Sequence, residues 1–143
     1  MDFWLVWAVF RLTGLNGLSG KHLNRSIRWA MIIMKRIMYN KYQRLQMELE
    51  QTGTGRMKCF GSSMSPILPS GGVMTTYRKQ DDYEVGDIVF CRVHGRFIDA
   101  HLITKKAECG FLISNNHGHD NGWTKQVFGK VVQVEWNGGG RTF

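Results

Sequence analysis

Short apolar runs, many of them alternating with polar residues, fill the second half of the chain. They are rich in Val, Ile, Phe and Thr and are bounded by Gly or by charged residues, which is the pattern of β-strands separated by turns. The sequence predicts strands at residues 73–77, 87–93, 96–104, 110–114 and 127–136. We therefore expect a mainly β fold, with a coiled antiparallel sheet or a partly open barrel.

The first third of the chain has a different pattern, which predicts a helical extension. Residues 3–10 form an uncharged apolar run, and residues 27–50 lack Gly and Pro. Within the second stretch, apolar residues recur at helical spacing, at Ile27, Met31, Met34, Met38 and Tyr42. Neither run reaches the roughly 20 apolar residues that a membrane-spanning helix needs. Residues 51–55 are typical of a linker, so the expected extension is 1–56, before a β domain at 57–136 and a flexible tail at 137–143.

The charge of the chain is concentrated in this extension. Residues 1–58 hold ten Lys and Arg and three acidic residues, a net charge of +7, whereas residues 59–143 hold nine and eight, a net charge of +1, which together give the total of +8. Three interpretations stay open for the basic segment. It contacts an anionic membrane surface, it binds nucleic acid or an acidic partner, or it is an upstream translation that is not part of the working protein.

The cysteines and the first residues bear on the cellular compartment. Cys59, Cys91 and Cys109 are odd in number and lack the spacing of a disulfide framework, which favours free thiols in a reducing compartment. Asp2 stands where a cleavable signal peptide has basic residues, and no small-x-small cleavage site follows at the right distance. We expect a cytoplasmic protein, with membrane association through the basic segment as an option.

A serine-rich turn carries the candidate chemistry. Residues 61–66 read Gly-Ser-Ser-Met-Ser-Pro, a composition that is also common in ordinary loops. A serine hydroxyl needs a neighbouring base to become a nucleophile, and a neutral imidazole is suited to that task. His101 lies on a predicted strand downstream. Small residues in the turn allow the backbone to approach a substrate carbonyl, and the N–H of Ser63 is a candidate donor to the oxyanion.

The order of three segments resembles a known superfamily of serine peptidases. Residues 63–66 read Ser-Met-Ser-Pro, residues 86–89 read Gly-Asp-Ile-Val, and His101 follows on a later strand. These segments resemble the superfamily of type I signal peptidases and LexA-like self-cleaving repressors, over roughly residues 57–136. The resemblance implies that Ser63 is the nucleophile and His101 the base, on a coiled sheet of the signal peptidase and LexA type. Ser62 and Ser65 are the alternative nucleophiles.

The sequence departs from this family at the base. The strand reads His-Leu-Ile from residue 101, where signal peptidases of the histidine type read His-Arg-Val-Ile. A slip of one residue would place Ala100 in the base position and turn His101 to the opposite face of the sheet. The nearby lysines, Lys105 and Lys106, are expected in a solvated turn after the strand.

A third group that orients the imidazole is implied by the same resemblance. Residues 115–123 occupy the place where signal peptidases of the histidine type carry a Gly-Asp-Asn and a further Asp, which makes Asp120 the best match. Asp99 is interpreted as an exposed strand charge. His117 and His119 with Asp120 are similar to a metal-ligand cluster, but no third His or Cys at a recognised spacing completes it. The sequence therefore predicts no metal and no cofactor.

The family branch that remains is a compact stand-alone domain of the kind found in phages and prophages. A LexA-like repressor would carry an Ala-Gly or Cys-Gly cleavage site before the serine, whereas Cys109-Gly110 lies after it. The expected function is a serine endopeptidase with a Ser-His dyad that cleaves a protein substrate in trans or its own N-terminal segment. The alternative is a non-catalytic module that binds nucleic acid or an acidic partner. Nothing in the sequence indicates an oligomeric state.

Overall fold

The computed structural model describes residues 25–143, which divide into two compact units between Met38 and Tyr39. The described part of the first unit is one helix, α2 (Arg25–Met38). The apolar run predicted at residues 3–10 lies outside the described residues. In the part of the chain from residue 25 onward, no helix combines the length and the apolar character needed to cross a membrane.

The helical stretch predicted at residues 27–50 is two helices, because a capping motif interrupts it. Helix α3 (Lys41–Thr52) begins after Asn40, whose side chain accepts a hydrogen bond from the backbone N–H of Gln43 at 2.9 Å. The Gln43 side chain accepts from the backbone N–H of Asn40 at 3.1 Å in return. This reciprocal arrangement is a capping box, which starts a new helix without interrupting the apolar periodicity. Gly53, in the left-handed conformation with φ 77°, ends α3.

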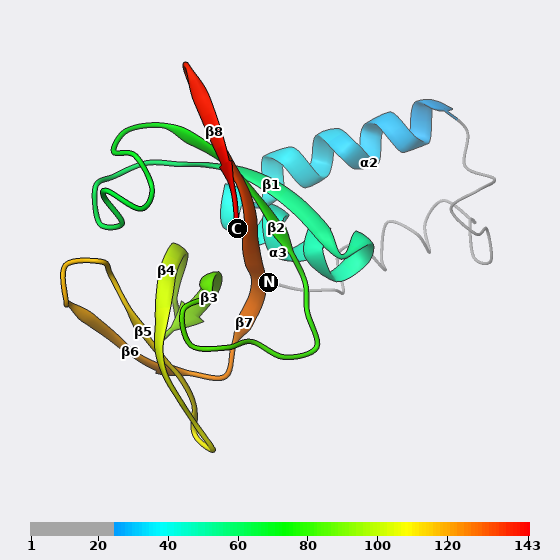
Figure 1. Cartoon of the computed structure of the whole chain (residues 1–143). Helices are drawn as coiled ribbons and strands as arrows, with labels where there is room; N and C mark the ends of the chain where they lie inside the picture. Colours follow the sequence, from blue (N-terminus) through cyan, green and yellow to red (C-terminus); the bar gives the residue numbers. More distant parts are fainter. Residues whose placement is uncertain (1–24) are drawn as a thin grey trace. The chain divides into compact units, whose positions relative to one another are not determined.

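The second unit is built on one curled antiparallel half-barrel sheet, and the mainly β fold is therefore confirmed (Figure 1). The strands follow the order β1-β2-β7-β3-β4-β5-β6, and β8 pairs with β7 beside this path. They are β1 (Thr54–Cys59), β2 (Val73–Arg78), β3 (Ile88–Val93), β4 (Arg96–Ala107), β5 (Gly110–Ser114), β6 (Asp120–Thr124), β7 (Val127–Trp136) and β8 (Gly139–Thr142).

Five of these strands, β2, β3, β4, β5 and β7, lie where the sequence predicts them. The other three were not predicted, because glycines weaken their local preference for a strand. Strand β1 covers part of the expected linker, β6 lies in an expected polar turn, and β8 occupies the expected tail. Each is held by a partner strand, for example by the pairing of Gly55 with Tyr77 and of Gly139 with Trp136.

Helix α3 belongs to the β unit, so the domain boundary expected at residue 57 moves to residue 39. Leu45 and Leu49 are 1% and 0% exposed and pack into the core of the sheet. The helix approaches β1 so closely that a Cβ added to Gly55 would lie 2.7 Å from a methyl carbon of Leu45. A residue other than glycine at position 55 would require the buried Leu45 side chain to move.

Strand β3 is buried on both faces and joins two hydrophobic clusters. Phe90 belongs to one cluster, whereas its neighbours Val89 and Cys91 belong to the other, and all three are 0% exposed. The three cysteines are free thiols, as predicted. Because β4 is hydrogen-bonded directly to this fully buried strand, residues on the adjoining half of β4 stand on a rigid support.

Candidate active site

The serine turn lies in the loop between β1 and β2 and is anchored by two buried side chains. The side chains of Met64 and Leu68 are 4% and 5% exposed and lie in the main hydrophobic cluster. The backbone N–H of Leu68 donates to the Met64 carbonyl at 3.0 Å, and that of Ser65 donates to the Ser62 carbonyl at 3.0 Å. The buried side chains of Met64 and Leu68 attach the turn to the sheet. Ser63 lies between these two side chains and solvent.

A second loop, between β5 and β6, fixes the turn from the side. The backbone N–H of Asn116 donates to the Ser63 carbonyl, its side-chain amide donates to the Ser65 carbonyl, and the His117 Nε2 donates to the Ser62 carbonyl, all at 3.0 Å. His117 is therefore a hydrogen-bond donor to the backbone of the serine turn. Three carbonyls of a short segment are thus bonded from one partner loop, which restricts the position of Ser63.

The structure brings His101 to the serine. His101 lies on β4, where it pairs with Val89 of β3, and its Nε2 lies 3.0 Å from the Ser63 Oγ. The register slip would require His101 to face away from Ser63, which is not what the structure has. Ala100 instead points into the core, with 5% of its surface exposed.

The other ring nitrogen of His101 contacts Asn121 of β6. The Nδ1 lies 2.6 Å from the Asn121 Oδ1, and an amide oxygen only accepts hydrogen bonds. The Nδ1 therefore carries the proton in the neutral ring, and the lone pair of Nε2 is directed at the Ser63 hydroxyl. Asn121 fixes the tautomer that a general base requires. The resemblance had implied the neighbouring residue, Asp120, for this position.

Asp120 lies beside the site without touching the imidazole. Its Oδ1 accepts a hydrogen bond from the Ser114 Oγ at 2.5 Å, and that hydroxyl also bonds the Thr104 Oγ1 at 2.8 Å. The three side chains connect β4, β5 and β6. Ser114 pairs with Asp120 and Ile113 pairs with Gly122, so Asn121 is the extra residue of a bulge in β6. The position of this bulge decides which of the two adjacent side chains reaches the imidazole.

Lys106, one of the two lysines near the base, is not placed to act in its stead. Strand β4 continues through Lys105 and Lys106, where a solvated turn was expected. The Lys106 Nζ contacts the carboxylates of Asp82 at 2.6 Å and Glu84 at 3.0 Å. The hydrogen bond to Asp82, followed by that to Glu84, raises the pKa of Lys106. A protonated ammonium in this ion pair has no lone pair with which to accept a proton.

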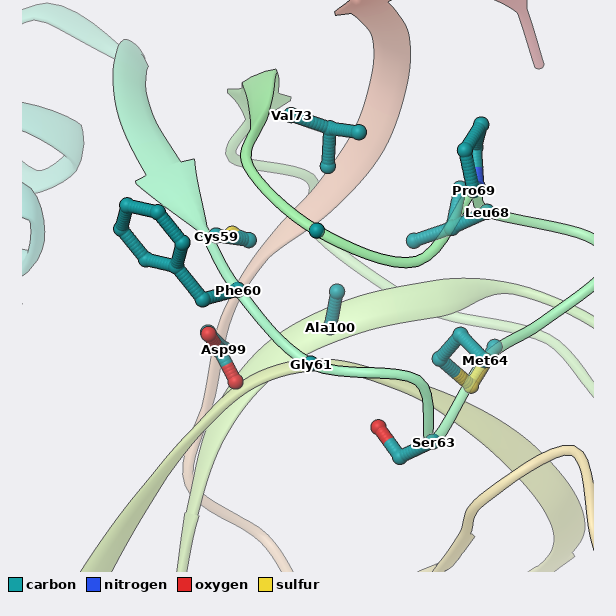
Figure 2. A pocket seen from close by; sticks show the side chains of 11 residues that line it. Cys59, Phe60, Gly61, Ser63, Met64, Leu68, Pro69, Val73, Asp99 and Ala100 are labelled. Atoms are coloured by element: carbon teal, nitrogen blue, oxygen red, sulfur yellow. The ribbon is translucent and has the colours of Figure 1, made fainter.

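A small cleft opens beside the Ser63 hydroxyl (Figure 2). It is lined mostly by small and apolar residues: Cys59, Phe60, Gly61, Ser63, Met64, Leu68, Pro69, Gly71, Val73, Asp99 and Ala100. Over the part of the chain that the structure describes, the backbone N–H of Ser63 has no hydrogen-bond acceptor. It is available to a carbonyl oxygen that enters the cleft, as an oxyanion donor must be.

Asp99 is not the exposed strand charge that the sequence suggested. Its side chain is half-buried and lines the cleft, while its backbone carbonyl accepts a hydrogen bond from the Tyr77 hydroxyl at 2.5 Å. Burial raises the pKa of the nearby Cys59 thiol, and the negative charge of Asp99 adds to this rise. Cys59 therefore enters the cleft as a neutral thiol at neutral pH.

Comparison of the chain with protein-family models and with curated proteins finds no match. The chemistry of the protein is therefore inferred from the geometry of Ser63, His101 and Asn121.

Proposed function

We propose that this protein is a serine peptidase in which Ser63 is the nucleophile, His101 the general base and Asn121 the residue that orients the base. The observation that carries the proposal is the continuous hydrogen-bonded line from the Ser63 Oγ to the His101 Nε2 at 3.0 Å and from the His101 Nδ1 to the Asn121 Oδ1 at 2.6 Å. A nucleophile, a base and an orienting group within hydrogen-bond reach are the elements of a catalytic triad.

The reaction follows from these positions. The Ser63 Oγ attacks the carbonyl carbon of the substrate while its proton passes to the His101 Nε2, and the carbonyl oxygen becomes an oxyanion near the N–H of Ser63. The imidazolium then gives its proton to the leaving amine, the C–N bond breaks and an acyl-enzyme remains. Water attacks this ester with the imidazole again as base, which releases the acid and restores the Ser63 hydroxyl.

The sheet supports a peptide as the substrate. Strand β4 pairs with β3 from residue 96 to residue 102, but β5 pairs with β4 only from Leu102 onward. Among the strands that the structure describes, the segment of β4 that carries His101 thus has one neighbour, β3. An extended peptide that pairs with this edge of the sheet gains main-chain hydrogen bonds. It lies along the segment of β4 that ends at His101. The substrate is a protein in trans or the N-terminal segment of the chain itself.

Removal of the two reacting groups tests the mechanism. Ser63→Ala and His101→Ala should abolish peptide cleavage, and Ser63→Ala should abolish labelling by a fluorophosphonate reagent that phosphonylates active serines. Ser70→Ala is the matched control, because Ser70 is an exposed serine of the same loop that does not line the cleft. Labelling that persists in Ser63→Ala and disappears in Ser70→Ala would refute the assignment.

A second function is favoured by helix α2, and we propose that it binds an anionic membrane surface. The helix reads RSIRWAMIIMKRIM and contains no acidic residue. Trp29 and Ile33 are 57% and 52% exposed. A basic helix with exposed apolar side chains is suited to the interface of an anionic bilayer, whereas nucleic acid requires no apolar face.

Vesicle binding separates this function from catalysis. The protein should bind vesicles of phosphatidylcholine with phosphatidylserine, and binding should weaken when salt is added or when Trp29 and Ile33 are replaced by Ser. Binding to single-stranded DNA that exceeds binding to these vesicles would favour nucleic acid instead. Ser63→Ala should bind vesicles as the parent does, because residue 63 belongs to the other compact unit.

A further inference from the structure

An acidic side chain lies in the cleft beside the nucleophile. Asp99 lies on β4 between Ile98 and His101, in the part of the strand where the register with β3 shifts. Asp99 and Ser63 line one cleft, and Figure 2 displays both side chains. A substrate whose carbonyl group reaches the Ser63 hydroxyl therefore passes within reach of the Asp99 carboxylate.

The charge of Asp99 is not balanced within the cleft. Among residues 25–34 and 39–143, whose side chains the structure describes, no side chain or backbone N–H donates a hydrogen bond to its carboxylate, and no Lys, Arg or His forms an ion pair with it. Cys59 is the other titratable group of the lining besides the nucleophile itself, and it is a neutral thiol because burial raises its pKa. A half-buried carboxylate without a partner is electrostatically complementary to a cation.

Two lysines stand near the cleft but do not line it. The Nζ atoms of Lys41 and Lys58 lie 5.6 Å and 5.5 Å from the ring centroid of Phe60. The Lys41 Nζ also donates to the Lys58 carbonyl at 3.3 Å. Their ammonium groups are thus held on the exposed ring of Phe60. The carboxylate of Asp99 is the formal charge that a substrate meets inside the cleft.

We propose that Asp99 is a specificity residue that binds a Lys or Arg side chain of the substrate close to the bond that is cleaved. This inference rests on the proposed peptidase function and names its substrate class, a basic peptide. The ammonium or guanidinium of the substrate donates a charge-assisted hydrogen bond to the carboxylate, and the partly buried setting strengthens that bond relative to one in water. Apolar residues such as Val73 and Leu68 contact the methylene groups of the same side chain.

A mixture of synthetic peptides, with products identified by mass spectrometry, reveals the position of the basic residue relative to the cleaved bond. A matched pair of peptides then carries Lys or norleucine at that position. The parent should cleave the Lys peptide with a kcat/KM about tenfold higher, which corresponds to about 1.4 kcal/mol. In Asp99→Asn this ratio should fall to about one. Asp81→Asn removes one negative charge from an exposed loop and should keep the parent's ratio.

The ratio also responds to salt in the parent, which requires no variant. It should decrease as sodium chloride is added, because ions screen a partly exposed pair. A ratio near one in the parent, a ratio that Asp99→Asn retains, or a preference for Glu peptides would each overturn the assignment. The last result would point to Lys58 instead.

Failure of the peptidase function is distinguishable from failure of this inference. If neither the mixture nor the matched peptides are cleaved, the function is wrong, and the role of Asp99 is decided by binding. The Ser63→Ala protein should then bind the Lys peptide about tenfold more tightly than the norleucine peptide. The double variant Ser63→Ala and Asp99→Asn should bind both peptides with equal affinity. Equal affinities already in Ser63→Ala would overturn the inference.

Discussion

Residues 96–101 of strand β4 pair with β3, residues 103–107 pair with β5, and Leu102 pairs with both. In the second half, polar side chains have partners within the protein, for example Thr104 with Ser114 and Lys106 with Asp82. In the first half, the Asp99 carboxylate has no such partner among the side chains that the structure describes, and the His101 imidazole is directed at a hydroxyl. The second half is thus a structural half, whereas the first is an open half, whose polar side chains are available to a substrate.

The largest effect is expected at His101, in the open half. His101→Ala removes the proton acceptor of Ser63 and should lower kcat by about 10³-fold or more. The melting temperature should change little, because the side chain is only partly buried. Kinetics with the best peptide of the mixture and thermal unfolding of the same preparation measure both quantities. A variant that is inactive because it is unfolded would give no information on the base, so the comparison requires a melting curve like that of the parent.

The next effect distinguishes two adjacent residues of β6. Asn121→Ala removes the group that fixes the His101 tautomer and should lower kcat by about 10- to 100-fold, with little change in stability. Asp120→Ala removes the acceptor of a buried Ser114 hydroxyl and should lower the free energy of unfolding by about 1 kcal/mol. Steady-state kinetics and chemical denaturation of both variants check the assignment. If the kinetic loss follows Asp120 instead, the register of β6 at the site differs from the structure.

Asp120 and Asn121 show the limit of what the sequence alone predicts about the site. Ser63 and His101 were expected from the turn and the downstream strand, because those segments carry their signal locally. Asn121 was missed because the choice between positions 120 and 121 depends on a bulge in the pairing of β5 with β6. A bulge is a property of two strands together, and it leaves no clear mark in either of them.

The fold has the same division between local and non-local information. Strands rich in Val, Ile and Phe were predicted because their residues prefer the extended conformation. Strand β1 was missed because its glycine is required by α3, through the close approach of Gly55 to Leu45. The role of α3 itself was missed because helical periodicity continues across Asn40, where the capping box divides the stretch. Tertiary contacts decide both features.

A smaller effect concerns the pH dependence of the open half. The His101 imidazole must be neutral to accept the Ser63 proton, so kcat/KM should rise with pH and then level off. In Asn121→Asp, a carboxylate faces Nδ1 and favours the protonated ring, so the neutral form is reached only at higher pH. The midpoint should move upward. A pH–rate profile that is identical in parent and variant would indicate that the Asn121 contact does not form in solution.

The smallest effect is expected at Lys106, in the structural half of β4, which pairs with β5. Hydrogen bonds to Asp82 and then Glu84 raise the pKa of Lys106, and the bond to Lys106 is the first cause that lowers the pKa of Asp82. The raised pKa of Lys106 stabilises the fold at pH values below the pKa of this lysine in the unfolded state, and the stabilisation is lost as the pH rises through the pKa in the folded state. The lowered pKa of Asp82 stabilises the fold at pH values above the pKa of this carboxyl in the unfolded state, and the stabilisation is lost as the pH falls through the pKa in the folded state.

The ion pair is therefore present throughout the neutral range. In that range Lys106→Ala should leave kcat/KM within about twofold of the parent, because surface ion pairs contribute little. Any small difference in melting temperature between parent and variant should disappear at strongly alkaline pH and at strongly acidic pH. A large loss of activity in Lys106→Ala would mean that the two halves of β4 are coupled, and that the comparison between an open and a structural half does not hold.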